Sequence, residues 1–230
     1  MKKSALFILF VFVSLTSCAT EEQIVKKDNI VTVLANPSIP KLAQPIKPIN
    51  AGEFPPSLVL GTRFTFRQGN VVTKNWTAVQ WVVKDLIEWQ GNRAYVIDIG
   101  GSFIIWDMNL NYLATLSGDG KVVSAANPSI RTYLWPLKLG TTYDAVYDYY
   151  SGGKKVMTSK DSITIENITD VTVPMGNYSA FVLKRVSTGL VEKIYFSPLV
   201  GFPVKWQWSQ SMEHSQGPGE FVVELVKIEK

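Results

Sequence analysis

The chain has 230 residues, of which 46% are hydrophobic, 18% charged and 12% aromatic, so it can bury a substantial core. Its 23 lysine and arginine residues nearly balance its 19 aspartate and glutamate residues. The formal net charge of +4 therefore argues against a nucleic-acid-binding protein, which would concentrate basic residues on one surface.

The first segment, MKKSALFILFVFVSLTSC, contains two lysines and then an apolar run from Ala5 to Leu15. This run is shorter than the roughly 20 apolar residues that a membrane-spanning helix needs. It ends in Leu-Thr-Ser-Cys18, which resembles the lipobox of bacterial lipoproteins. The resemblance implies that residues 1–17 are a signal peptide and that Cys18 receives lipid on its sulfur and an acyl chain, such as palmitate, on its amine. The alternative is an ordinary secretory peptide with a chance cysteine near the cut.

Cys18 is the only cysteine, so the chain cannot form an internal disulfide. The covalent lipid on Cys18 is the only cofactor that we expect, and several acyl chains hold a protein stably on a membrane. Because Ala19 is not aspartate, the lipobox resemblance implies an outer-membrane location, on the periplasmic side rather than at the cell surface. Removal of residues 1–17, which include Lys2 and Lys3, leaves 21 basic against 19 acidic residues.

Residues 18–56 are predicted to be a tether that follows the lipidated cysteine. Six of the twelve prolines fall there, and Phe54 is the first aromatic residue within this stretch. Proline-rich chain extends by about 3.1 Å per residue, so the tether can reach on the order of 100 Å from the membrane. One stretch, Ile30–Leu34, is rich in β-branched residues, and the alternative to a solvated tether is that this stretch adds an edge strand to the folded body.

Residues 57–230 are predicted to be a single antiparallel β-domain. Apolar and polar residues alternate in many short segments, which Gly-containing turns separate at hairpin spacing. Ala78–Trp89 has a partly helical pattern, but its valines and tryptophans favour a strand. We expect eleven to thirteen strands in an all-β fold, either a curved antiparallel sheet or a half-open β-barrel.

A weak repeat suggests two equivalent halves. LVLGTRF at residues 58–64 matches LKLGTTY at residues 137–143, and each copy opens a predicted strand. The alternatives are a duplicated unit, one wide curved sheet, or a coincidence of a common strand-entry pattern.

Residues 135–205 contain three phrases in order, WPLKLGTTY, VTVPMGNYSAF and YFSPLVGFPVK. They resemble uncharacterised periplasmic β-domains in which PLxxGxxY precedes VxVPxGxFxA and YxSPxVGxPVK. The resemblance implies a half-closed antiparallel barrel similar to the lipoprotein-carrier group. It implies no activity.

The sequence gives little support for catalysis or for a metal site. His214 is the only histidine, and no Gly-x-Ser-x-Gly motif occurs. The Asp107, Asn109, Asn111 series lacks the glutamate that closes a calcium loop. The candidate carboxylate pairs are Asp144 with Asp148 and Glu88 with Asp98. The first pair would lie about 13 Å apart on a strand, too far for glycoside hydrolysis. We therefore expect no enzyme, no metal and no non-covalent cofactor.

Aromatic residues are the remaining candidates for a ligand or partner surface. Tyr143, Tyr147 and Tyr149 share one face of a strand, as do Trp206 and Trp208. The alternative is that both rows belong to the core. We expect an interaction module that the lipid anchor holds on the membrane and that docks on an envelope protein or cell-wall component, with no nucleic-acid partner. The alternative is a carrier that holds a lipid or acyl chain against a concave aromatic face.

Overall fold

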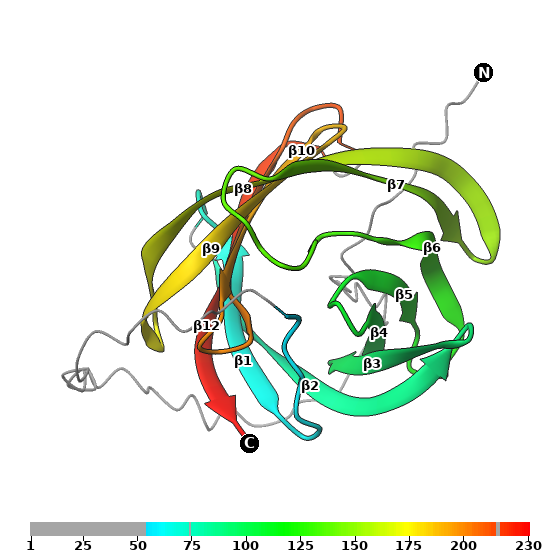
Figure 1. Ribbon diagram of the computed structural model, residues 1–230, viewed down its shortest axis with the longest axis horizontal. Helices are drawn as coiled ribbons and strands as arrows, with labels where there is room; N and C mark the ends of the chain where they lie inside the picture. Colours follow the sequence, from blue (N-terminus) through cyan, green and yellow to red (C-terminus); the bar gives the residue numbers. More distant parts are fainter. Residues whose placement is uncertain (1–53, 74, 215–216) are drawn as a thin grey trace, which may run out of the picture. The chain divides into compact units, whose positions relative to one another are not determined.

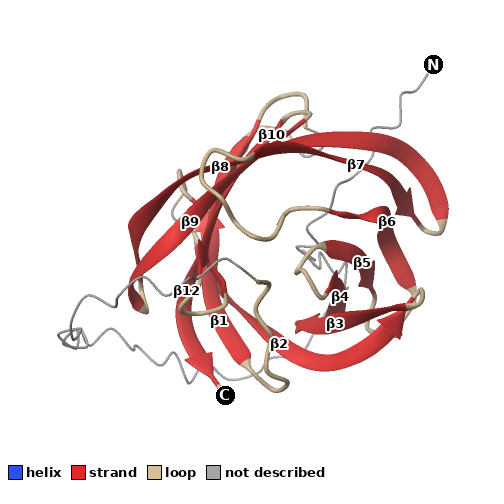
Figure 2. Cartoon of the chain, viewed as in Figure 1, coloured by secondary structure: helices blue, strands red, loops and turns tan. Residues whose placement is uncertain are grey.

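The computed structural model describes residues 54–73, 75–214 and 217–230. The signal peptide, Cys18, most of the tether and Ile30–Leu34 lie outside these residues, so the predictions that concern them stay predictions. Twelve strands form one closed antiparallel barrel, in which each strand pairs with its neighbours in sequence and β1 pairs with β12 (Figures 1 and 2). The strands are β1 (Arg63–Asn70), β2 (Trp76–Trp89), β3 (Asn92–Ile99), β4 (Ser102–Asp107), β5 (Tyr112–Leu116), β6 (Val122–Ile130), β7 (Thr142–Ser151), β8 (Lys154–Val173), β9 (Gly176–Ser187), β10 (Leu190–Ser197), β11 (Phe202–Gln210) and β12 (Gly219–Glu229).

The prediction of an all-β, antiparallel, barrel-type fold is confirmed, and the strand Trp76–Trp89 replaces the helix that its pattern also allowed. The barrel is closed, whereas the sequence suggested an open sheet or half-open barrel. Closure satisfies the backbone groups that an open sheet would leave unpaired at its two edges. No helix among the described residues has the length and apolarity that a membrane crossing requires.

Strand alternation fills the barrel interior with large side chains. In β1, Phe64 and Phe66 point inward and are buried, while Arg63 and Arg67 lie outside. Rings from opposite sides of the barrel meet in the middle, because Trp106 of β4 lies 5.5 Å from Phe202 of β11 between ring centroids. The main core is therefore the lumen of the barrel itself.

The connection between β6 and β7, residues 131–141, crosses the ring of strands in Figure 1. Its Tyr133 and Leu137 are buried in the main core, and Trp135 stacks on Tyr133 with centroids 5.9 Å apart. Burying such side chains contributes about 1.5–3 kcal/mol each relative to exposure. This connection therefore packs as part of the core.

The sequence repeat corresponds to equivalent features in the two halves, β1–β6 and β7–β12. Gly61 and Gly140 both have positive φ, 85° and 76°. Gly61 donates its N–H to the carbonyl of Val83 at 2.8 Å, and Gly140 donates to the carbonyl of Ile165 at 2.9 Å. Directly after Val83, the pairing of β2 with β3 shifts by one residue, and directly after Ile165 the pairing of β8 with β9 shifts in the same way. The two halves thus share strand entry and bulge position.

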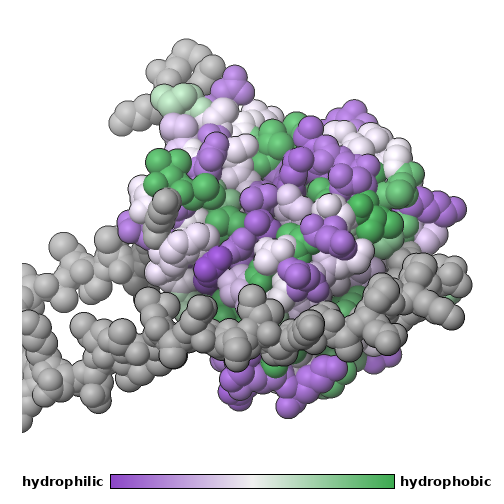
Figure 3. Space-filling model, turned by 90° about the vertical axis from the view of Figure 1, so that its left-hand side faces the viewer, coloured by the Kyte–Doolittle hydropathy of each residue, from purple (hydrophilic) through white to green (hydrophobic). Residues whose placement is uncertain are grey.

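The outside of the second half carries ion pairs. Glu224 of β12 lies 2.6 Å from Arg67 and 2.9 Å from Lys205, and Glu166 of β8 lies within 3.6 Å of Lys184 and Lys193. Figure 3 shows the side of the molecule that includes β8, β9 and β12, where hydrophilic side chains are spread among apolar ones. Ion pairs therefore join neighbouring strands on the outside of this half.

Candidate functional site

The tyrosines that the sequence proposed as a contact surface point into the barrel. On β7, Tyr147 and Tyr149 are buried and Tyr143 is half-buried. The hydroxyl of Tyr143 donates to the carbonyl of Thr132 at 2.7 Å, and that of Tyr147 donates to a carboxylate oxygen of Asp161 at 3.0 Å. A partner on the outside of the barrel cannot reach these two buried rings, so the row belongs to the interior.

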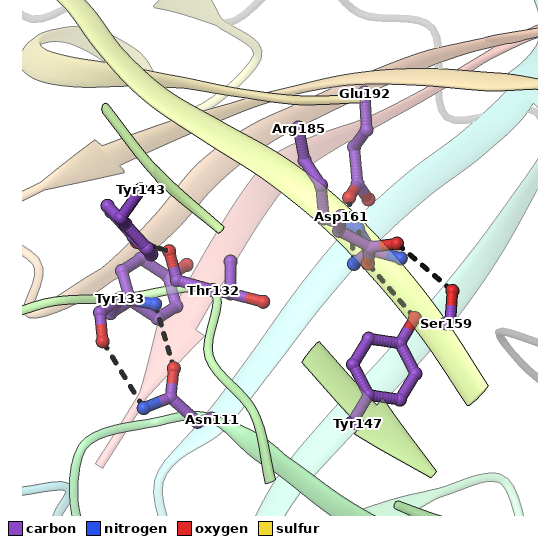
Figure 4. Close-up of polar contacts among 9 residues, drawn as sticks. All are labelled: Asn111, Thr132, Tyr133, Tyr143, Tyr147, Ser159, Asp161, Arg185 and Glu192. Atoms are coloured by element: carbon purple, nitrogen blue, oxygen red, sulfur yellow. Dashed lines mark hydrogen bonds and ion pairs between the residues drawn. The ribbon is translucent and has the colours of Figure 1, made fainter. Parts of the chain in front are cut away.

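Next to this row lies a group of charged side chains that we call the inner charged cluster: Asp161, Arg185 and Glu192, with Tyr147 and Ser159. Asp161 on β8 is 0% exposed, Arg185 on β9 is 2% exposed and Glu192 on β10 is 3% exposed. Arg185 Nε lies 3.1 Å from Asp161 Oδ2, and its Nη1 lies 3.2 Å from Glu192 Oε2. Figure 4 shows the guanidinium between the two carboxylates, with the Tyr147 hydroxyl below them.

Strand pairing places the cluster. Arg185 and Glu192 sit opposite each other in the β9–β10 register, and Ile163, two residues after Asp161, sits opposite Arg185 in the β8–β9 register. Ser159 donates to the second carboxylate oxygen of Asp161 at 3.4 Å. Four neighbouring strands, β7 to β10, are therefore joined by one polar network inside the lumen.

Burial dominates the electrostatics of the cluster. It raises the pKa of Glu192, and the nearby Asp161 raises it further, while Arg185 offsets part of the shift. Burial alone would lower the pKa of Arg185, but the carboxylates of Glu192 and Asp161 outweigh it and raise the pKa. Burial also raises the pKa of Tyr147, so its hydroxyl stays a donor. With both carboxylates ionised, the cluster would hold two negative charges against one positive charge.

A second polar group fixes the β6–β7 connection. Asn111 accepts the N–H of Tyr133 at 2.7 Å and donates to its carbonyl at 3.2 Å, so one side chain satisfies both backbone groups of Tyr133 (Figure 4). Asp107 holds the same turn by accepting the N–H groups of Asn109 and Asn111 at 2.8 and 2.9 Å. The series that lacked a calcium-loop glutamate therefore forms a polar turn that anchors the connection.

The two tryptophans of the proposed surface also face inward. Trp206 is buried, with its ring centroid 5.2 Å from Trp81 and 5.9 Å from Phe66. Trp208 is half-buried, stacks on Phe221 at 5.4 Å and lies opposite Glu192 in the register. Trp206 thus belongs to the aromatic core, and Trp208 borders the inner charged cluster.

The remaining chemical candidates from the sequence lie apart from this cluster. Asp144 and Asp148 are on the outer face of β7 and pair with Lys160 and Lys155, both at 2.7 Å. Lys84 lies 3.6 Å from Asp98. His214 lies in the β11–β12 connection, where burial lowers its pKa. Within the described residues, no group of three or more His, Cys, Asp or Glu side chains is placed to hold a metal ion.

Sequence reasoning missed Arg185 and Glu192, although a signal for both exists. In β9, Arg185 has the same strand phase as Phe181 and Leu183, and in β10, Glu192 has the same phase as Leu190 and Ile194. A charged residue in the apolar phase of two consecutive strands indicates a buried ion pair between them.

Among the solved structures that are similar to this chain are the following three. A candidate lipoprotein from Parabacteroides distasonis ATCC 8503 is 9% identical, with 74% of this chain and 96% of that chain covered and a TM-score of 0.43. A candidate exported protein with a YmcC-like fold from Bacteroides fragilis NCTC 9343 is 13% identical, with 78% and 100% covered and a TM-score of 0.43. The hypothetical lipoprotein YmcC from Escherichia coli K12 is 8% identical, with 74% and 85% covered and a TM-score of 0.37. No protein-family model and no curated protein matches the chain.

Proposed function

We propose that the chain is a lipid-anchored interaction module of the cell envelope. Acylated Cys18 holds it at the outer membrane, on the periplasmic side, and the barrel docks on an envelope assembly or a cell-wall component. It has no enzymatic activity. The observation that carries the proposal is that the barrel fills its lumen with its own side chains.

Aromatic rings at the centre of the barrel occupy the space that a carried apolar ligand would need. Phe202 has ring contacts with Phe64 at 4.2 Å, Trp106 at 5.5 Å and Trp206 at 6.2 Å, which come from three different strands. An acyl chain inside the barrel would have to displace such rings from their packed positions, and deleting a packed aromatic side chain costs about 3–5 kcal/mol. This packing supports docking over carriage of an apolar ligand.

The inner charged cluster is consistent with a rigid docking body. A buried ion network specifies one strand arrangement, because any other register would leave charges unpaired in the lumen. We propose that Asp161, Arg185 and Glu192 fix the register of β7 to β10 and keep the outer surface in one shape.

The proposal is tested in cells by site-specific photo-crosslinking. A benzophenone side chain is placed at exposed positions, Val72 and Met212 at one end of the barrel and Leu199 at the other. Docking predicts a discrete adduct from one end of the barrel, lost when Cys18→Ser releases the protein from the membrane. Mass spectrometry of Cys18 tests the lipid, and organic extraction of the purified protein tests carriage. Stoichiometric bound lipid with no adduct at any position would replace docking with the carrier function.

A further inference from the structure

Two seams join the halves of the barrel, and the seam between β6 and β7 is much the shorter. At the other seam, β12 pairs with the whole of β1, from Arg63 to Asn70. At the β6–β7 seam, only residues 124–127 of β6 pair with residues 148–151 of β7, next to the β7–β8 hairpin. Residues 142–147, the first six of β7, therefore pair with β8 on one side and with no strand of the described chain on the other.

The seam is short because β6 turns away from β7 toward the β4–β5 turn. The Ser129 hydroxyl donates to a carboxylate oxygen of Asp107 at 3.1 Å, and Ile130 pairs with Tyr112 of β5. Residues 126–129 of β6 lie opposite a single residue of β5, so the strand bulges there. The end of β6 is thus held by β4 and β5 and does not continue along β7.

The β6–β7 connection does not take the place of β6 beside β7. Tyr143 points into the lumen, and its hydroxyl donates to the carbonyl of Thr132 at 2.7 Å (Figure 4). Thr132 therefore lies the length of a tyrosine side chain below the inner face of β7, and Tyr133 after it is buried in the main core. No backbone hydrogen bond joins residues 131–141 to residues 142–147, all of which the structure describes.

Strand geometry identifies the backbone groups that this leaves without a strand partner. Ile165 of β8 donates its N–H to the carbonyl of Thr141 at 2.9 Å, so the carbonyl of Thr141 faces β8. By alternation, residues 143, 145 and 147 also direct their N–H and C=O groups to β8. The groups on the β6 side belong to three residues with exposed side chains, which we call the free edge of β7: Thr142, Asp144 and Val146.

We infer that the free edge of β7 binds an extended segment of a partner protein, which adds a strand to the barrel at the β6–β7 seam. Unpaired strand backbone is a template for such pairing, because an extended peptide offers N–H and C=O groups at the same spacing. Neither a lipid surface nor a glycan carries donors and acceptors in that alternation. The inference rests on the proposed docking function and gives it a site and a kind of partner.

The charges around the free edge favour a segment with an acidic residue. Asp144 is balanced by Lys160 at 2.7 Å. Arg131 and Lys138 are exposed on the β6–β7 connection and have no ion pair with a described residue. Burial raises the pKa of Tyr143 and the charge of Arg131 offsets part of that shift, so Arg131 lies near the start of β7. Lys138 belongs to the tight turn directly before β7. An acidic side chain of the partner at this end of the edge would be attracted by both cations.

Hydrogen exchange of the isolated mature chain, residues 18–230 with Cys18→Ser, tests whether the edge is free. Thr65 and Arg67 are the residues of β1 that the repeat makes equivalent to Asp144 and Val146, and they face β12. The amides of Asp144 and Val146 should exchange about a hundredfold faster than those of Thr65 and Arg67. The amides at 143 and 145, which face β8, should be slow. Equally slow exchange of Asp144 and Val146 in the monomer would show that the edge is already paired and would overturn the inference.

Photo-crosslinking in cells tests the partner, with a benzophenone side chain in place of Val146, which is 53% exposed. Asp144→Pro removes the edge N–H and leaves the bonds to β8 in place. Asp144→Ala is the matched control, because it loses the same carboxylate and keeps the N–H. The adduct yield should be about tenfold lower in Asp144→Pro than in Asp144→Ala. Arg131→Glu with Lys138→Glu should also lower the yield.

A second pair of variants guards against a folding defect in Asp144→Pro, which urea unfolding of the purified variant would detect. Val146→Pro and Val146→Ala make the same comparison at the next edge position, with the benzophenone side chain in place of Thr142. The yield should again fall in the proline variant alone.

Four results would count against the inference. Equal adduct yields in the proline and alanine variants would overturn it, and so would an adduct made of two copies of this chain. A yield that charge reversal leaves unchanged would overturn the acidic character of the segment. An adduct from Val72, Met212 or Leu199 that survives Asp144→Pro would keep the proposed docking function and reject the free edge as its site.

Discussion

Replacing Glu192 by glutamine tests whether two ionised carboxylates beside the single guanidinium of Arg185 make the folded protein less stable than one carboxylate would. Asp161 and Glu192 both lie within 3.2 Å of Arg185, and all three side chains are at most 4% exposed. With both carboxylates ionised, the cluster carries one net negative charge in the lumen. Glu192→Gln leaves one carboxylate and one guanidinium, and an amide can still accept a hydrogen bond from Arg185.

The direction of the pH dependence follows from the raised pKa of Glu192. The folded protein holds the Glu192 proton to a higher pH than the unfolded chain, whose pKa is near the ordinary value of 4.5. The stability linked to that proton is fully present below pH 4.5 and is lost as the pH rises through the raised pKa. Wild type should therefore lose stability above pH 4.5 relative to Glu192→Gln, and the two should be nearly equal at pH 4.

Arg185→Met gives the opposite and larger effect. It leaves two buried carboxylates without their cation, which costs about 3–5 kcal/mol at pH 8. The loss should shrink as the pH falls and Glu192, whose pKa burial raises, takes up its proton. Urea unfolding followed by tryptophan fluorescence from pH 4 to 8.5 measures both variants, with the exposed Glu220→Gln as control and an unchanged m-value as the condition for comparison. A Glu192→Gln variant that is less stable than wild type at pH 8 by more than about 1 kcal/mol would refute the charge-balance argument.

Three further substitutions test the core, the repeat and the β6–β7 connection. Phe202→Ala removes a fully buried ring whose centroid lies 4.2 Å from that of Phe64. It should lower the free energy of unfolding in urea by about 3–5 kcal/mol. Gly140→Ala meets no atom within 4 Å, so only its φ of 76° opposes the change, and calorimetry should show a loss of about 1 kcal/mol. Asn111→Ala removes both hydrogen bonds to the Tyr133 backbone, so hydrogen exchange of the Tyr133 amide should accelerate at a cost of about 1–3 kcal/mol.

Local signals in the sequence predicted the strands well. Phe64 and Phe66 alternate with arginines, and glycines such as Gly140 mark the turns and strand entries that the structure contains. These features depend on residues close together in the chain, which a pattern can detect. The repeat around Gly61 and Gly140 was visible for the same reason.

Closure of the barrel and the composition of its interior depend on distant residues instead. The β1–β12 seam pairs Arg63 with Glu229, and nothing in either segment alone indicates that partner. The alternation of residues predicts that Tyr143, Tyr147 and Tyr149 share one face of a strand. It does not indicate whether that face lines an open concave surface or a filled lumen. The answer comes from rings such as Phe202, which arrive from the other side of the barrel.

The two halves of the barrel differ in chemistry at some equivalent outer positions. If both halves served only to build the sheet, equivalent outer positions should have similar character, as Val96 and Val182 do. Ala114 and Lys205 differ instead, and so do Ala125 and Glu224, which lie opposite them on the next strand. At each of these positions the second half carries one member of the Lys205–Glu224 ion pair and the first half carries an alanine, of which Ala114 is fully buried. The repeat therefore accounts for the backbone of both halves but not for the chemistry of their outer positions.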